Sequence, residues 1–429
     1  MTEAPLIRPT RAWRAAAVLA TASLVLTACG SGDDPDTADE PATETTSSAP
    51  EKKGDGTLTI GTLLPQTGDL AFLGPPEFTG VDLAIKEINE AGGVLGQDVA
   101  KFDADSGDGT PDIAGAEVDK LFSQNADAII GAAASGVSVS VIDKITGAGV
   151  VHLSPANTAA GFDTYEDNGL YFRTAPSDVL QGQVLGNLAV EDGFENVAVL
   201  ARQDFYGEGL ANKVRETLEE KGASVAEFIL YSADAQNFTA EINRIAASKP
   251  DAIVLVTFEE LTKIVPQLIA KGIGPQDVQL YLVDGNLADY SKQKFDLTGV
   301  KGTVPVPAEE DPTFNERLLE IRELDSFSYA AQSYDAAIII ALAAIAAGDD
   351  AGESVGAEII NVTKEGTQCS TFEECSALLE DGEDIDYQGA SGPTDMNDSG
   401  SPNSGTIGVQ QYNKGNKYEQ VDTVSGVIQ

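Results

Sequence analysis

The sequence predicts an α/β protein made of two lobes, each built on a doubly wound sheet whose strands are mainly parallel. Two observations predict this fold class. Short apolar runs alternate with helical patterns, as expected for a parallel sheet with helices on both faces. The alternation also occurs as two series, one before and one after residue 175, and together they are too long to share one sheet.

Residues 128–158 contain the clearest strand–helix–strand unit. An apolar run at 128–130 leads into a corner of small residues at 131–136, and a second apolar run occupies 150–153. Two parallel strands joined in this way take a right-handed crossover. Between the runs, apolar residues recur at the spacing of one buried helical face, namely at Val137, Val141, Ile142 and Ile145.

The carboxyl ends of these two strands carry residues suited to binding an anion. Ser135 stands where a helix N-cap belongs, and Ala156-Asn157-Thr158 follows the second strand with free backbone N–H groups and a hydroxyl. Ligands of open α/β sheets bind outside the carboxyl ends of the strands, where these two corners become neighbours. We therefore expect a site for a small carboxylate here.

The other elements follow from the same patterns. Gly92 and Gly93 end a helix that begins at Glu77, and Thr110-Pro111 begins the next one. An apolar stretch at 334–347 predicts a buried helix, because its 14 residues are too few to span a membrane. The final residues, from 406 onward, predict a hairpin. Further strands are expected at 58–64, 99–102, 196–201, 225–230, 252–258 and 280–283, and further helices from 178 and at 259–270 and 311–323.

Residues 1–28 predict a lipoprotein signal peptide. Arg8, Arg11 and Arg14 form a basic region, the next residues are apolar or small, and the Leu-Thr-Ala-Cys segment ending at Cys29 resembles the lipobox of bacterial lipoproteins. The alternative is an ordinary signal peptide followed by a chance cysteine. We expect export, lipidation of Cys29 and anchoring on the outer face of the bacterial cytoplasmic membrane. Residues 29–56, which are acidic and rich in Ser and Thr, predict a disordered linker.

Charge and cysteine content narrow the possible functions. The chain has 26 lysines and arginines against 69 aspartates and glutamates, a net charge of −43, which argues against a nucleic-acid partner. This charge favours solubility and is compatible with a saline habitat. If Cys29 carries lipid, Cys369 and Cys375 remain as a pair, and a disulfide between them is expected in an exported protein.

The sequence offers little for enzymatic chemistry. His152 is the only histidine, and it lies within an apolar run, where a structural role is expected. The sequence contains no Gly-x-Ser-x-Gly elbow and no Walker A motif. We therefore expect a binding protein without a cofactor or a metal, and not an enzyme.

Six short motifs, in their order and spacing, are similar to those of one family. The chain resembles the branched-chain amino acid binding proteins of bacterial ABC importers, which are periplasmic binding proteins of type I, and the resemblance covers residues 57–429. The motifs are residues 76–80 (PEFTG), 129–131 (IIG) with Ser135, 154–158 (SPANT), 205–209 (FYGEG), 334–336 (YDA) and 389–393 (GASGP).

The resemblance implies the type I periplasmic-binding-protein fold, in which two lobes joined by three crossing segments close on a ligand. Residues 57–174 and 306–390 would form lobe 1, and residues 175–305 and 391–429 would form lobe 2. The implied function is delivery of an amino acid, foremost a branched-chain one, to an ABC transporter permease by a monomeric protein. A ligand-sensing receptor lipoprotein and a binder of small amides or urea with the same fold are the alternatives.

The resemblance also implies roles for individual residues. The residues that would hold the ligand's α-carboxylate are Ser135, Ala156, Asn157 and Thr158. Asp284 matches the acidic residue that binds the α-ammonium, although its other interpretation is a turn acid before Gly285.

Aromatic residues cover the ligand in such proteins. Tyr206 and Phe258 are the matching candidates here, with Tyr329 as a further one. Leu73 stands where family members often have tyrosine, with Phe72 beside it. Phe258 replaces a frequent tyrosine, and Asn157 replaces a frequent alanine. The side chain that the pocket accepts is therefore left open.

Overall fold

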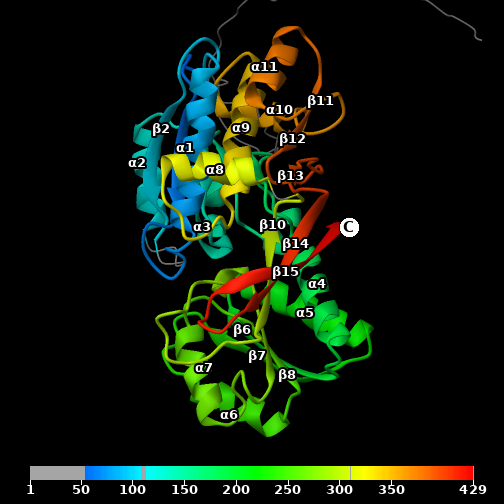
Figure 1. Cartoon of the computed structure of the whole chain (residues 1–429). Helices are drawn as coiled ribbons and strands as arrows, with labels where there is room; N and C mark the ends of the chain where they lie inside the picture. The colour runs from blue at the N-terminus through cyan, green and yellow to red at the C-terminus, as the bar shows by residue number, and fades with distance from the viewer. Residues whose placement is uncertain (1–53, 108–112, 310, 429) are drawn as a thin grey trace, which may run out of the picture. The chain divides into compact units, whose positions relative to one another are not determined.

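The computed structural model describes residues 54–107, 113–309 and 311–428. The predicted signal peptide, the lipidation site Cys29, most of the predicted linker and the expected helix start at Thr110-Pro111 lie outside these residues. Within them the chain forms two main sheets, each flanked by helices, as Figure 1 shows. The predicted α/β class is confirmed.

The first sheet has five strands in the order β2-β1-β3-β4-β5, and every pairing in it is parallel. Its central strands are buried along their whole length, which explains why they appear in the sequence as continuous apolar runs. Its elements are β1 (Thr59–Leu64), α1 (Gly74–Glu90), β2 (Ala100–Asp105), α2 (Ala114–Ser123), β3 (Ala128–Gly131), α3 (Ser135–Thr146), β4 (Val151–Ser154), η1 (Ala160–Thr164) and β5 (Tyr171–Arg173).

The second sheet has seven strands in the order β15-β14-β10-β9-β8-β6-β7. Its pairings are parallel from β7 to β10, and the last two strands are antiparallel. Its elements are α4 (Asp178–Glu191), β6 (Asn196–Gln203), α5 (Gly207–Glu220), β7 (Ser224–Ser232), α6 (Thr239–Ser248), β8 (Ala252–Val256), α7 (Leu261–Ala270), β9 (Gln279–Leu282), η2 (Asp284–Asn286), β10 (Lys301–Val306), β14 (Ser404–Tyr412) and β15 (Tyr418–Val427).

The elements between β10 and β14 pack beside the first sheet, around one apolar helix. They are α8 (Pro312–Ile321), α9 (Ala330–Ala347), α10 (Gly352–Ile359), β11 (Thr367–Cys369), α11 (Phe372–Glu380), β12 (Ile385–Gly389) and β13 (Gly392–Pro393). By length and composition α9 could cross a membrane, but 83% of it is buried inside the protein, where it contacts α1, α10 and α11. It is the central helix of a hydrophobic core, as the apolar stretch at 334–347 predicts.

Two element boundaries differ from the sequence prediction. Helix α1 begins at Gly74 and not at Glu77, because two prolines occupy its first turn, where the absence of a backbone N–H does no harm. The predicted C-terminal hairpin is confirmed, but its strands are longer than expected, with nine and ten residues. It extends the second sheet beside β10.

The predicted disulfide is present. Cys369 at the end of β11 and Cys375 in α11 are bonded, and their Cα atoms are 5.4 Å apart. Both residues are buried in the core around α9. The bond ties the small three-stranded sheet β11-β12-β13 to the helix that follows its first strand.

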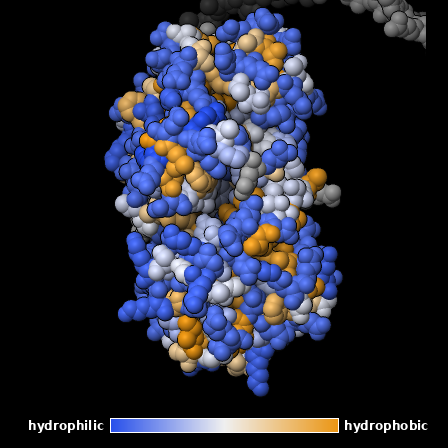
Figure 2. Space-filling view, viewed as in Figure 1, coloured by the Kyte–Doolittle hydropathy of each residue, from blue (hydrophilic) through white to orange (hydrophobic). Residues whose placement is uncertain are grey.

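The chain passes between elements of the two sheets three times. It leaves the first sheet after β5, returns after β10, and reaches the second sheet again before β14. The surface around these elements is mostly hydrophilic, and Figure 2 shows only small apolar patches on the visible face. This agrees with the large excess of acidic residues.

Candidate functional site

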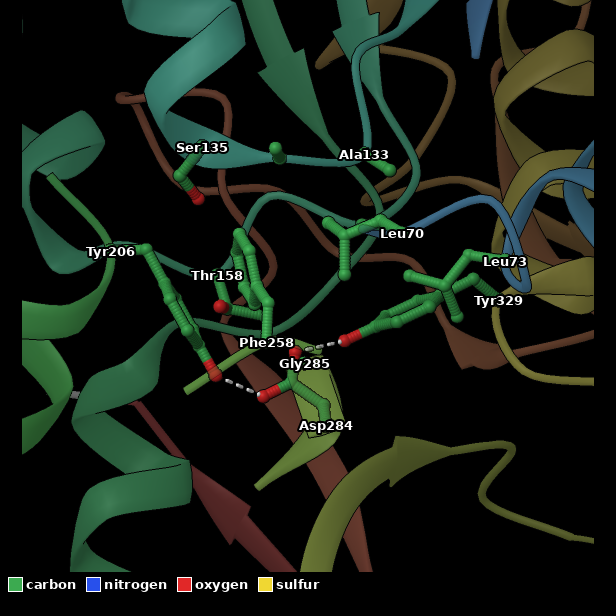
Figure 3. A pocket seen from close by; sticks show the side chains of 12 residues that line it. Leu70, Leu73, Ala133, Ser135, Thr158, Tyr206, Phe258, Asp284, Gly285 and Tyr329 are labelled. Atoms are coloured by element: carbon green, nitrogen blue, oxygen red, sulfur yellow. Dashed lines mark hydrogen bonds between the residues drawn. The ribbon is translucent and has the colours of Figure 1, made fainter. Parts of the chain in front are cut away.

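A small cavity, partly open to solvent, is lined by residues that follow strands of both sheets (Figure 3). One wall comes from the segments after β1, β3 and β4, and it includes Leu70, Leu73, Ala133, Ser135, Ala156 and Thr158. The other wall comes from the segments after β6, β8 and β9 and includes Tyr206, Phe258 and Asp284. Tyr329, the residue before α9, reaches Asp284 from the side of the first sheet.

The fold itself places these residues together. Parallel strands point the same way, so the segments that follow them meet at one edge of each sheet. The turn after β3 requires a glycine at position 131, because φ is +130° there and a Cβ would lie 2.0 Å from the carbonyl oxygen of Leu63. This turn leads the chain directly into the small residues that line the cavity.

Three of the four residues expected to hold a carboxylate line the cavity, and Asn157 does not. The Asn157 side chain is fully buried and bonded elsewhere: its Nδ2 donates to the carbonyl oxygens of Ala132 and Ala133, each at 2.9 Å, and its Oδ1 accepts from the Tyr171 hydroxyl at 2.9 Å. Asn157 therefore joins the two strand ends, and does not face a ligand.

Two expectations about this wall are wrong. Ser135 is the first residue of α3 and not its N-cap, which is Ala134, and its Oγ accepts from the Ala159 N–H at 3.4 Å. The N–H groups of Ala156 and Asn157 are not free, because both donate to Ser154 Oγ, at 3.3 and 3.0 Å. The Thr158 hydroxyl and the Ser135 hydroxyl are therefore the polar groups that this wall presents to the cavity.

Asp284 carries the charge of the other wall. Its carboxylate accepts from Tyr206 OH at 2.7 Å, from Gln181 Nε2 at 2.9 Å and from Tyr329 OH at 2.8 Å, and Figure 3 shows the two tyrosines reaching it. Burial raises the pKa of Asp284, and the three hydrogen bonds act against that rise. Both tyrosines have a pKa raised well above the ordinary value, chiefly by burial, so their hydroxyls remain donors.

A second carboxyl, which the sequence did not point out, belongs to Asp178 at the start of α4. Its side chain is fully buried, and the Thr158 side chain lies close enough to lower its pKa as a hydrogen-bond partner. Burial and the charge of Asp284 raise the pKa of Asp178 well above its ordinary range. Glu77 in α1 is a third buried carboxyl, and burial raises its pKa as well.

A buried cation packs against Phe258, one of the aromatic residues of the second wall. The rings of Tyr206 and Phe258 stack with centroids 5.5 Å apart. The guanidinium of Arg202 lies 3.7 Å from the centroid of Phe258, donates to Glu260 Oε1 at 2.9 Å and pairs with Asp204.

The apolar part of the cavity comes mainly from Leu70, Leu73 and Phe258. Leu73 lines the cavity, while Phe72 is only partly buried, packs against the core and does not line the cavity. Tyr329, the weaker aromatic candidate, contacts Asp284 directly. His152 lies fully buried in β4, away from the lining residues.

The site thus places two hydroxyls on one wall, a buried carboxylate on the other, and apolar side chains between them. Two α/β lobes with a cavity at the ends of their strands define the class of bilobal ligand-binding proteins. The sequence profile of the periplasmic binding protein family matches residues 57–416, and the chain belongs to that family.

Similar proteins bind different ligands. The leucine-, isoleucine-, valine-, threonine- and alanine-binding protein of Pseudomonas aeruginosa is 27% identical over 328 residues, 74% of this chain and 83% of its own. Two solved structures share the fold. The branched-chain amino acid transporter substrate-binding protein LivJ of Streptococcus pneumoniae, in complex with isoleucine, has a TM-score of 0.70, 22% identity, and coverage of 86% of this chain and 100% of its own. A solute-binding protein of R. palustris in complex with benzoate has a TM-score of 0.68, 18% identity, and coverage of 87% and 98%.

Proposed function

We propose that this protein binds an amino acid, foremost one with a branched aliphatic side chain, and delivers it to the permease of an ABC importer. The observation that carries the proposal is the buried carboxylate of Asp284 on one wall of a small cavity whose other wall presents the hydroxyls of Ser135 and Thr158. The P. aeruginosa relative named for binding leucine, isoleucine and valine supports the same ligand class.

The chemistry of the cavity favours a zwitterion. A buried ammonium group needs a carboxylate partner, and a buried carboxylate needs hydrogen-bond donors. Asp284 is the carboxylate partner for the ammonium group, and the hydroxyls of Ser135 and Thr158 are two of the donors for the ligand's carboxylate. Leu70, Leu73 and Phe258 then surround an apolar side chain, so a charged side chain would lose its hydration without finding a partner.

An aromatic acid such as benzoate fits this site less well. Benzoate carries no cation, so enclosing it in the cavity would leave the charge of Asp284 uncompensated beside a second negative charge. A small neutral amide could donate N–H groups to Asp284 but would leave the two hydroxyls without an anion. The ammonium partner is the feature that separates the three ligand classes.

We also propose the setting in which binding takes place. We place residues 57–174 and 306–403 in one lobe and residues 175–305 and 404–429 in the other; the boundary expected at 390 moves to 403 because β13 pairs with β12 and Met396 packs in the core around α9. Ligand contacts to both lobes favour the closed form over the open one. Lipid on Cys29 holds the monomeric protein on the outer face of the cytoplasmic membrane, with residues 29–56 as the tether.

A thermal-shift screen of the purified protein tests the ligand class. We expect leucine, isoleucine or valine to stabilise the protein by about 2.7 kcal/mol when the ligand is present at roughly 100 times its dissociation constant. Benzoate, urea and small amides are the comparison ligands, and stabilisation by one of these without any amino acid would contradict the proposal. The protein's own fluorescence is not needed for this readout.

Replacing Ser135 by alanine tests the carboxylate wall. We expect Ser135→Ala to weaken leucine binding by about 2 kcal/mol, because the substitution removes a hydrogen bond to a charged group. Ser140→Ala is the matched control, since Ser140 lies in the same helix, is exposed and donates only to the Val137 carbonyl oxygen. Calorimetric titration of both variants gives the comparison, and equal affinities for the two would remove Ser135 from the site.

A further inference from the structure

Arg173, the last residue of β5, is completely buried and lies behind the cavity wall that carries Thr158. Its Nη1 donates to two backbone carbonyl oxygens, that of Asn157 at 3.2 Å and that of Ala159 at 3.0 Å. These carbonyls stand directly before and directly after Thr158 in the chain. One guanidinium group therefore holds both sides of the residue whose hydroxyl faces the cavity.

Arg173 is also connected to two of the segments by which the chain crosses between the sheets, to one directly and to the other through Asp163. Its Nε donates to Ser401 Oγ at 2.9 Å, and the Arg173 backbone N–H donates to the Gly400 carbonyl oxygen at 2.9 Å, both in the segment before β14. Its Nη2 pairs with Asp163, whose carboxylate accepts from Ser401 Oγ at 2.7 Å and, in the segment after β5, from Ser177 Oγ at 3.0 Å.

We propose that Arg173 is a positioning residue for ligand binding: it fixes the Thr158 loop to the two crossing segments and so holds the Thr158 hydroxyl in place for the ligand's carboxylate. This inference rests on the proposed function, because it assumes a ligand that carries a carboxylate. No lysine or arginine lines the cavity among the described residues, so recognition of that carboxylate depends on neutral donors. Neutral donors act well only when they are held in the right orientation.

Arginine suits this task and lysine does so only in part. A guanidinium has five N–H donors in a rigid plane, and Arg173 uses them on two carbonyls, one hydroxyl and one carboxylate. An ammonium group is a single point with three donors on a flexible stem. Lysine at position 173 can keep the ion pair with Asp163, but it cannot also reach the two carbonyls on either side of Thr158.

The test compares Arg173→Lys and Arg173→Met with Arg202→Lys as the matched control. Arg202 is also a buried arginine paired with acids, but it holds Phe258 on the other wall. Calorimetric titrations use L-leucine and L-leucinamide, which lacks the carboxylate charge. We expect the preference for leucine over leucinamide to fall about tenfold or more in the Arg173 variants and to stay unchanged in Arg202→Lys, which should weaken both ligands equally.

Hydrogen exchange on the ligand-free full-length protein provides a second readout. We expect amides in a peptide covering residues 156–160 to exchange about tenfold faster in Arg173→Lys than in the wild type, with no such change in Arg202→Lys. If Arg173→Met does not fold, Arg173→Lys carries the test. An equal loss of both ligands together with unchanged exchange would overturn the inference and leave Arg173 a purely structural residue. If the wild type binds no amino acid, the proposed function fails, and the exchange result alone decides whether Arg173 positions the loop.

Discussion

Replacing Asp284 by alanine is expected to weaken amino acid binding by about 2–4 kcal/mol, because it removes one partner of a buried charged pair and leaves the ligand's ammonium group unpaired. The loss should be seen as a dissociation constant raised by roughly 30- to 1000-fold in calorimetric titrations with leucine. The Asp284→Asn variant tests the contribution of the negative charge, because asparagine has nearly the same shape as aspartate. Asparagine keeps only one acceptor oxygen, whereas Tyr206 donates to one oxygen of Asp284 and Tyr329 to the other, and it also lacks the negative charge. We therefore expect this variant to lose most of the same affinity.

Asp192→Ala is the matched control for this prediction. Asp192 accepts from the Tyr281 hydroxyl at 2.6 Å and from Lys301 Nζ at 2.6 Å, so it also belongs to a tyrosine–carboxylate arrangement near the second sheet, but it does not line the cavity. We expect Asp192→Ala to lower the stability of the protein and to leave its affinity unchanged. Leucine affinity near the wild-type value in both Asp284 variants would show that the ammonium group binds elsewhere.

Much of the fold could be predicted because its signals are local. The apolar runs at 128–130 and 150–153 and the helical spacing from Val137 to Ile145 are properties of neighbouring residues, and the structure contains each of these elements. The sequence prediction starts α1 too late, because it relies on the apolar spacing, which becomes visible only after the first turn. The structure shows that the helix already begins with the turn that contains the two prolines. The expected N-cap position of Ser135 differs from the structure by one residue, which is the usual uncertainty of helix ends.

The supporting residues of the site could not be predicted, because their partners are distant in the sequence. Gln181 and Asp284 are 103 positions apart, and Arg173 and Ser401 are 228 apart. In the sequence Asp178 appears only as an acidic residue in the first turn of a helix, a common and unspecific pattern. Asn157 shows the converse error. The sequence places it in the right corner, but only the structure shows that its amide group faces the carbonyls of Ala132 and Ala133.

The stability of the protein is expected to depend on pH through His152. This residue is fully buried in β4, its ring contacts Tyr171 edge-on, and burial lowers its pKa from 6.5 to about 4, with the Gly131 backbone acting in the opposite direction. As the pH falls through 6.5 the unfolded chain binds a proton there and the folded chain does not. The free energy of unfolding therefore falls progressively between pH 6.5 and about pH 4, by about 3 kcal/mol in total. Above pH 6.5 the full contribution of neutral His152 to the stability of the protein is present.

His152→Phe isolates this contribution. Phenylalanine keeps an aromatic ring beside Tyr171 and does not titrate, and His152 is the only histidine of the chain, so the variant has no imidazole left to protonate. Burial raises the pKa values of Asp178 and Glu77, so these two residues make the folded protein less stable as the pH rises. Because wild type and variant share both residues, this effect cancels in the difference between the two proteins. Urea unfolding between pH 4 and 8 should therefore give a free-energy difference between wild type and variant that changes by about 3 kcal/mol in favour of the variant as the pH falls. A difference that stays constant over this range would mean that the folded protein accepts a proton on His152 as readily as the unfolded chain does.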